Sequence, residues 1–200
     1  ESYMEEVYKL LCFFLGEPPK NFTWEYKNKK NNYNIKSNLT PLSFYENNVP
    51  FDFNDYICVI NDPRKEHPYF NTYTVKYLGN VVDGNKVKYL NLPINRIKEL
   101  VLSSLKRNKS VWYGCDVGQF LNRTNCRMDK NNFKYLELLG TNFKLNKEER
   151  LRYKDSLMTH AMVITGANTN KKDCLEENET VNSWEVENSW SSSGPSKGYY

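Results

Sequence analysis

The spacing of apolar and polar residues predicts an amphipathic helix over residues 2–15. Four apolar side chains recur at three- and four-residue intervals, which places them on one helical face: Val7, Leu10, Leu11 and Phe14. Gly16 follows the last apolar turn and Pro18 comes shortly after it, as is typical where a helix ends. We therefore expect this helix to stop before Gly16.

Three further helices are predicted from capping residues and apolar spacing. Thr40 begins a short helix that reaches about residue 45, because threonine caps a helix well and the proline after it fits the first turn. Pro93 begins a longer helix with one apolar stripe: Ile94, Ile97, Val101 and Leu105. Asn146 begins a third with a capping box, and we expect it to end near residue 157.

Short apolar runs predict strands in the rest of the chain. Single strands are expected at residues 22–26, 56–60, 111–115, 160–165 and 184–187. A hairpin is expected between residues 72–78 and 86–90, which flank an Asp-Gly turn, and polar loops are expected at 28–34 and 171–179. This mixture of helices and short strands lacks a repeated β-α-β rhythm, so we predict an α+β fold.

Composition and charge fit an ordinary globular protein. The length of 200 residues suits one domain, or one domain with an extension, and 39% hydrophobic residues allow a packed core. The net charge of +4 comes from charges spread along the chain, whereas a nucleic-acid surface needs clustered basic residues. The densest run, Lys27, Lys29 and Lys30, keeps nucleic-acid binding as a secondary alternative. No signal peptide or membrane span is visible, so no membrane partner is expected.

The cysteine and histidine content limits the chemistry of the chain. The chain has two histidines and no glycine-rich phosphate loop, so we predict neither a metal site nor a cofactor. His67 lies among turn residues and is predicted to be a surface histidine without a role. The odd number of cysteines and the lack of a Cys-x-x-Cys pair indicate reduced thiols and a cytoplasmic location. These cysteines are Cys12, Cys58, Cys115, Cys126 and Cys174.

His160 and Asn188 are the candidate catalytic residues. His160 begins one apolar strand, and Asn188, 28 residues later, follows another. Two such strands joined by a polar loop bring these ends to one rim of a sheet, where the amide oxygen can accept a hydrogen bond from the imidazole. Trp190 is expected on the same side, where it shields the pair from water.

Local features alone leave a structural interpretation open. A lone histidine at a strand start is usually packed or bonded at the surface, and asparagine before serine is common in turns and caps. The catalytic interpretation gains because His160, Asn188 and Trp190 occur in this order. They are also followed by Gly198 and Tyr199.

In this arrangement the chain resembles the papain superfamily, in which a histidine strand precedes Asn-Ser-Trp and a later Gly-Tyr. A finer resemblance is to the bleomycin hydrolase family, whose sequences contain stretches very like residues 22–26, 61–64, 111–118, 156–162 and 186–190. It covers nearly the whole chain. It implies a papain-like α+β fold, with a helical extension over residues 1–71 and the antiparallel, barrel-like half of the peptidase over 72–200.

The resemblance also implies residue roles. His160 matches the catalytic histidine, Asn188 the asparagine that orients it, and Trp190 the tryptophan that covers both. None of the five cysteines has the context of the family's nucleophile, which follows a glutamine and begins a helix next to a tryptophan. We therefore expect the nucleophile outside this chain. Ser191 stands where the family usually has glycine, which puts the loop geometry in doubt more than the proton transfer.

The activity implied by the resemblance is that of a cysteine aminopeptidase, which hydrolyses peptides and small amides by thiolate acyl transfer. The family further implies a homohexamer with enclosed active sites, and we expect the 200-residue chain to be inactive by itself. A catalytically inactive pseudo-peptidase that serves as a binding or scaffold subunit is the alternative. The residue aligned with the nucleophile distinguishes the two.

Overall fold

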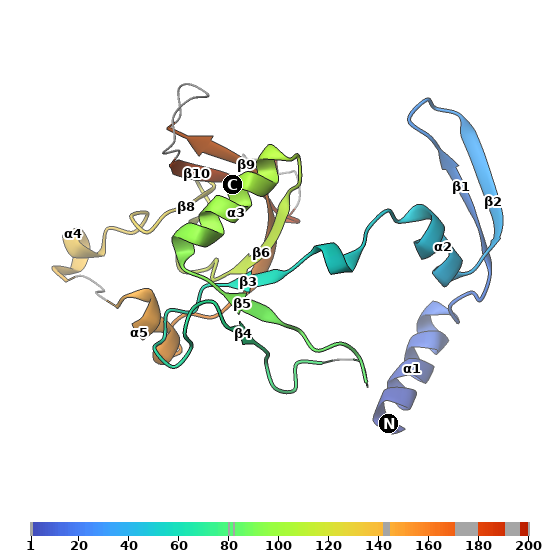
Figure 1. Ribbon diagram of the computed structural model, residues 1–200, viewed down its shortest axis with the longest axis horizontal. Coiled ribbons are helices and arrows are strands. Elements are labelled where there is room, and N and C mark those ends of the chain that lie inside the picture. The colour runs from blue at the N-terminus through green and yellow to red at the C-terminus, as the bar shows by residue number, and fades with distance from the viewer. Residues whose placement is uncertain are drawn as a thin grey trace. The chain divides into compact units, whose positions relative to one another are not determined.

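The computed structural model describes residues 2–79, 81, 83–141, 145–170, 180–190 and 197–199. The chain divides into two compact units, Glu1–Tyr56 and Ile57–Tyr200 (Figure 1). This division concerns packing, and the predicted boundary between a family extension and a papain-like domain at residue 71 stays a prediction. The loop predicted at residues 171–179, Cys174 and Ser191 lie outside the described residues.

The first unit contains a helix, a hairpin and a second helix. Its elements are α1 (Ser2–Leu15), β1 (Phe22–Lys27), β2 (Tyr33–Leu39), α2 (Pro41–Asn48) and the 3-10 helix η1 (Phe53–Asp55). The predicted end of α1 is confirmed, because Gly16 adopts a φ of +83° and its N–H bonds to the carbonyl of Cys12 at 2.9 Å. No described residue of α1 is buried, so its apolar face is not covered by the described part of the chain.

The polar loop predicted at residues 28–34 is present as a turn over 28–32, but the strand β2 that begins at Tyr33 was not predicted. Strand β2 pairs antiparallel with β1, and Asn28 closes the turn by accepting hydrogen bonds from the backbone N–H groups of Lys30 and Asn32 at 2.9 and 3.0 Å. Helix α2 begins with a capping box between Thr40 and Ser43, as its first residues predict, and extends to Asn48. Aromatic side chains pack between these elements, and the rings of Trp24 and Phe44 meet edge-on with 4.8 Å between their centroids.

The second unit is built on a three-stranded antiparallel sheet in the order β10-β9-β6. Its strands are β6 (Val111–Cys115), β9 (His160–Thr169) and β10 (Val181–Glu187). Helix α3 (Ile94–Lys106) lies across one face of this sheet (Figure 1). The helix and the sheet enclose the core, and its buried members are Val101, Val117, Met162, Ile164 and Val186. The apolar stripe of α3 is confirmed in its centre, whereas Ile94 at its start is 47% exposed.

A second sheet, in the order β3-β5-β4, differs from the predicted hairpin. Its strands are β3 (Cys58–Ile60), β4 (Thr72–Tyr73) and β5 (Tyr89–Asn91). β4 and β5 do pair antiparallel, but over two residues each, and β5 pairs on its other side with β3 in parallel. The expected strands at 72–78, 86–90 and 56–60 were therefore too long, because the pairing depends on β3, which lies far away in the sequence.

A buried polar network fixes the loop that follows β3. The side chain of Asn91, which is fully buried, accepts a hydrogen bond from the N–H of Asp62 and donates to the carbonyls of Asp62 and His67, all at 2.8 Å. The Asp62 carboxylate in turn bonds Arg64 and His67 at 2.6 Å. Burial by itself raises the pKa of Asp62, but the hydrogen bonds from Arg64 and His67 outweigh it and hold that pKa well below its usual range. The side chain of His67 is 33% exposed and so reaches the surface as predicted, but its structural role as a partner of Asp62 was not predicted.

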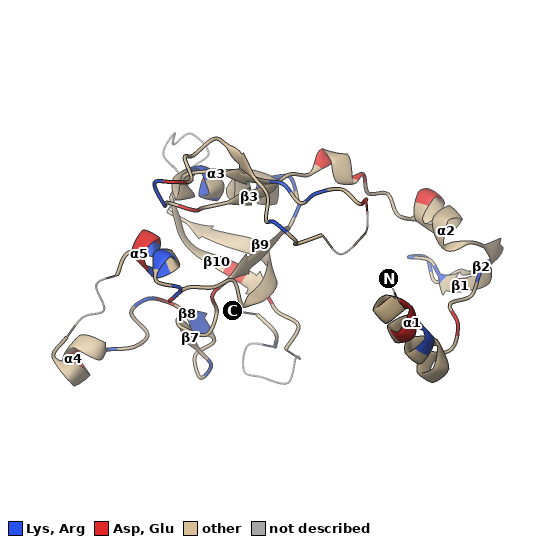
Figure 2. Ribbon diagram, turned by 90° about the horizontal axis from the view of Figure 1, so that it is seen from below, with Lys and Arg blue, Asp and Glu red and all other residues tan. Residues whose placement is uncertain are grey.

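Shorter elements complete the second unit. They are β7 (Leu121–Asn122), β8 (Arg127–Met128), α4 (Tyr135–Leu139) and α5 (Lys147–Arg152). The capping box of Asn146 is confirmed, but α5 ends at Arg152 rather than near 157, because Lys154 leaves helical geometry with a φ of +58°. Charges of both signs cover α5 (Figure 2), and Arg152 forms two hydrogen bonds to Glu66, at 3.0 and 2.9 Å. These contacts fasten α5 to the loop after β3.

The predicted α+β fold is confirmed. Helices and short, mostly antiparallel sheets coexist, and the described strands form four small sheets that do not close into a barrel. No helix within the described ranges is long and apolar enough to cross a bilayer.

Candidate active site

The site lies where β9 begins and β10 ends. These neighbouring strands are antiparallel, with Glu187 opposite Val163, so the first residue of β9 and the residue after β10 reach the same end of the sheet. His160 occupies the first position and Asn188 the second. Their proximity therefore follows from the register of two strands whose apolar residues are held in the core.

The imidazole of His160 and the amide of Asn188 form a hydrogen bond with a defined direction. Nε2 of His160 lies 2.9 Å from Oδ1 of Asn188, and the same Oδ1 accepts the backbone N–H of Ser189 at 2.8 Å. The second bond identifies the oxygen of the amide, because a backbone N–H requires an acceptor. Nε2 must then carry the proton, and in the neutral ring Nδ1 is left as the basic nitrogen.

Asn188 is held in place by the chain that returns beside it. Its side chain and backbone are 8% exposed, and its N–H bonds to the carbonyl of Gly198 at 2.8 Å. Gly198 adopts a φ of +92°, a conformation that glycine reaches without a steric penalty, and Glu187 forms a bridge with Tyr199. The Gly-Tyr pair noted in the sequence thus fixes the backbone of Asn188.

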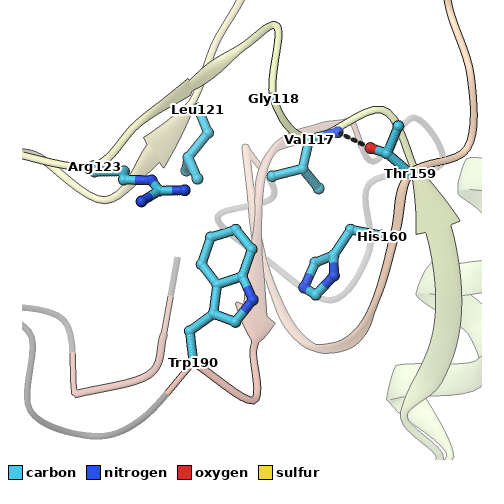
Figure 3. Close-up of a pocket in the computed structure, with 7 residues that line it drawn as sticks. All are labelled: Val117, Gly118, Leu121, Arg123, Thr159, His160 and Trp190. Atoms are coloured by element: carbon cyan, nitrogen blue, oxygen red, sulfur yellow. Dashed lines mark hydrogen bonds between the residues drawn. The ribbon is translucent and has the colours of Figure 1, made fainter.

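Trp190 stacks on the imidazole of His160. Its ring stacks on His160 with 4.7 Å between centroids and 30° between planes, and it remains 40% exposed on the outside. The guanidinium of Arg123 lies 5.3 Å from the centroid of the Trp190 ring, so that the indole lies between Arg123 and His160 (Figure 3). The imidazole is therefore shielded on its stacked side.

A pocket of about 290 Å³ opens beside these rings (Figure 3). Its wall residues are Val117, Gly118, Leu121, Arg123, Thr159, His160 and Trp190. Leu121 and Arg123 come from β7 and the turn after it, and nothing in their sequence pattern connected them with His160. The interpretation of the sequence therefore found the histidine side of the pocket and missed the side that the β7–β8 hairpin provides.

Cys115 is a candidate for the nucleophile by position, because β6 pairs with β9 so that Cys115 lies opposite His160. Its side chain packs against the apolar core, and neither a hydrogen bond nor an ion pair joins these two described side chains. Burial raises the pKa of the Cys115 thiol, and the nearby Asp116 adds to this, while a hydrogen bond from Tyr113 opposes it. A thiol that resists ionisation in an apolar setting is a poor nucleophile.

None of the other described cysteines is among the residues that line the pocket. Cys12 belongs to α1, Cys58 to β3, and Cys126 lies in the turn between β7 and β8 with a φ of +53°. Within the described ranges, no group of three or more His, Cys, Asp or Glu side chains is arranged to hold a metal ion. The chemistry available in the described part of the site is thus that of an oriented imidazole.

Comparison with known proteins identifies the family to which the chain is similar. The model of the peptidase C1-like family matches residues 1–200. The chain is 43% identical to aminopeptidase C of Listeria innocua, covering all of this chain and 44% of that protein. It is also 43% identical to human bleomycin hydrolase, with 98% of this chain and 43% of that protein covered. A crystal structure of PepW from Lactobacillus rhamnosis matches with a TM-score of 0.90 and 41% identity, over all of this chain and 43% of that one.

The chain belongs to the peptidase C1-like family. The resemblance predicted from the sequence is confirmed, and so is the papain-like character of the fold. The chain spans less than half the length of the peptidase C1-like relatives described above.

Proposed function

We propose that the longer protein containing this chain is a cysteine aminopeptidase that hydrolyses peptides and small amides. His160 is its acid and base, Asn188 orients His160, and the nucleophilic cysteine comes from outside this chain. One observation carries the proposal: Nε2 of His160 is committed to Oδ1 of Asn188 at 2.9 Å, which leaves Nδ1 for proton transfer. The names of the relatives, aminopeptidase C and bleomycin hydrolase, support the same class of reaction.

The mechanism transfers an acyl group to sulfur and then to water. A cysteine thiolate, paired with protonated His160, attacks the substrate carbonyl, and Nδ1–H of the imidazolium then protonates the leaving amine as the C–N bond breaks. In the second half Nδ1 takes a proton from water, whose oxygen attacks the thioester. The acid is released, and the thiolate and the imidazolium form again.

Asn188 and Trp190 assist this cycle without exchanging protons. The bond from Nε2 to Asn188 selects the tautomer and fixes the ring plane, which keeps Nδ1 aimed while the ring changes charge. The Trp190 ring stacked at 4.7 Å keeps water from one side of the imidazole, and the loss of water strengthens the attraction between imidazolium and thiolate.

The alternative is a catalytically inactive pseudo-peptidase that acts as a binding or scaffold subunit. It would keep the bond between His160 and Asn188 and lack the nucleophile. A homohexameric assembly and a cytoplasmic location belong to the proposal through the family resemblance. Nucleic-acid binding through the basic turn between β1 and β2 (Figure 2) is a secondary alternative, and it would require binding that weakens steeply with salt.

The proposal is tested with the full-length protein and a fluorogenic aminoacyl amide. We expect hydrolysis of the substrate with a free amino group and loss of that hydrolysis after alkylation of the protein's thiols. The same amide with an acetylated amino group is the control for aminopeptidase character, and we expect it to be cleaved at least about tenfold more slowly. A purified, folded protein that cleaves neither substrate would favour the pseudo-peptidase.

A further inference from the structure

Among the described residues that line the pocket beside His160, Arg123 is the one whose side chain is always charged. Arg123 lies in the turn after β7 and reaches the Trp190 ring at 5.3 Å from its centroid (Figure 3). It is exposed, and no described carboxylate forms an ion pair with it. Its guanidinium is therefore held by an aromatic ring and keeps its N–H groups for another partner.

The position of His160 indicates which part of a substrate meets this pocket. In the proposed reaction the imidazole protonates the leaving nitrogen, so that nitrogen must come within hydrogen-bonding distance of the ring. A pocket with His160 in its wall then receives the residue attached to that nitrogen. For an aminopeptidase this is the second residue of the peptide, which becomes the first residue of the released product.

The remaining walls fit a side chain that is apolar near the backbone and charged at its end. Val117 and Leu121 provide apolar contacts, whereas Arg123 lies at the edge formed by the hairpin (Figure 3). A guanidinium binds a carboxylate in a planar, two-bond geometry. A glutamate in this pocket would place its methylene groups on the apolar wall and its carboxylate at Arg123.

We propose that Arg123 is a specificity-determining residue that favours substrates with a carboxylate on the leaving residue. The inference rests on the proposed peptidase function and adds a substrate class to it. The carboxylate can belong to an acidic side chain at the second position or to the free carboxyl terminus of a dipeptide. Both offer the guanidinium the same group, so the experiment has to distinguish them.

The test measures kcat/KM of the full-length protein for two matched pairs of peptides. The first pair carries glutamate or glutamine as the second residue, with an amidated carboxyl terminus, and the second is alanyl-alanine against its amide. We expect the carboxylate member of at least one pair to be preferred about two- to fivefold, the range of an exposed ion pair. The preference should shrink as salt is raised.

Variants assign this preference to Arg123. Arg123→Gln should bring the ratio within a pair close to one, whereas Arg123→Lys, which keeps the charge, should keep part of it. Arg127→Gln, on the same hairpin but outside the pocket wall, is the matched control and should leave the ratio unchanged. If Arg123 only supported Trp190, its loss would slow both members of a pair equally, and that result would overturn the inference.

Failure of the inference and failure of the proposed function are distinguishable. A wild-type ratio of one in both pairs, with clear turnover, overturns the inference and leaves the peptidase proposal standing. Turnover of none of the peptides contradicts the peptidase proposal. In that case calorimetry measures the affinity of the protein for glutamic acid α-amide and for glutamine α-amide. Equal affinities for the two amides would overturn the inference, and so would a preference for the glutamic acid amide that survives in Arg123→Gln.

Discussion

Replacing His160 with alanine in the full-length protein is expected to lower kcat/KM for an aminoacyl amide by about a thousandfold. The variant loses both the base that holds the thiol ionised and the acid that protonates the leaving amine, and each proton transfer contributes strongly. Steady-state kinetics with a fluorogenic amide measure the effect. The residual rate should come from substrate binding and oxyanion stabilisation alone.

The second histidine of the chain provides the control for this variant. His67→Ala removes one partner of Asp62 and should lower the thermal unfolding midpoint, while kcat/KM of the folded enzyme should stay within about twofold. His160→Ala should instead lower kcat/KM strongly and leave the thermal unfolding midpoint nearly unchanged, because His160 is not among the buried residues of the core. Equal losses of activity in both variants would mean that the effect of His160 is one of folding.

Replacing Asn188 with alanine is expected to lower kcat by about a hundredfold, with a smaller effect on KM. The proton donor and acceptor remains, but the ring can adopt the wrong tautomer or rotate once Nε2 has lost its acceptor at 2.9 Å. Because Asn188 is buried and also accepts the N–H of Ser189, we expect a loss of about 1–2 kcal/mol in the free energy of unfolding as well.

A conservative variant separates orientation from folding at this position. Asn188→Asp keeps a side-chain oxygen in the same place and should retain more of kcat than Asn188→Ala. Urea unfolding of both variants reports their stability independently of turnover. Equal kcat values for Asn188→Ala and the unchanged protein would exclude an orienting role.

The positions of His160 and Asn188 could be predicted because the strands that carry them belong to the core. The apolar runs of β6, β9 and β10 are buried together, and their register decides where His160 and Asn188 lie. Both residues could therefore be placed at one rim of the sheet from periodicity and order, whereas their roles were implied by the family resemblance. Trp190, two residues beyond Asn188, was expected on the same side for the same reason, whereas the hydrogen bond from the N–H of Asn188 to the carbonyl of Gly198 was not predicted.

Features that depend on distant partners escaped prediction. Strand β2 is rich in asparagine and lysine, so its composition resembles a loop, and it exists because it pairs with β1. The parallel pairing of β3 with β5 has no local signal, and neither has the polar network that Asn91 forms with Asp62. Arg123 was missed for the same reason, since only the folding of the β7–β8 hairpin brings it to Trp190.

The most direct test of the central claim is the pH dependence of thiol alkylation in the full-length protein and in His160→Ala. We expect one cysteine, mapped by mass spectrometry outside positions 12, 58, 115, 126 and 174, to react with iodoacetamide well below the ordinary thiol pKa of about 8.5. In His160→Ala the reaction of that cysteine should move to near that value, because the imidazolium that stabilises the thiolate is gone. No such cysteine, a fast-reacting Cys115, or an unchanged profile in His160→Ala would contradict the claim.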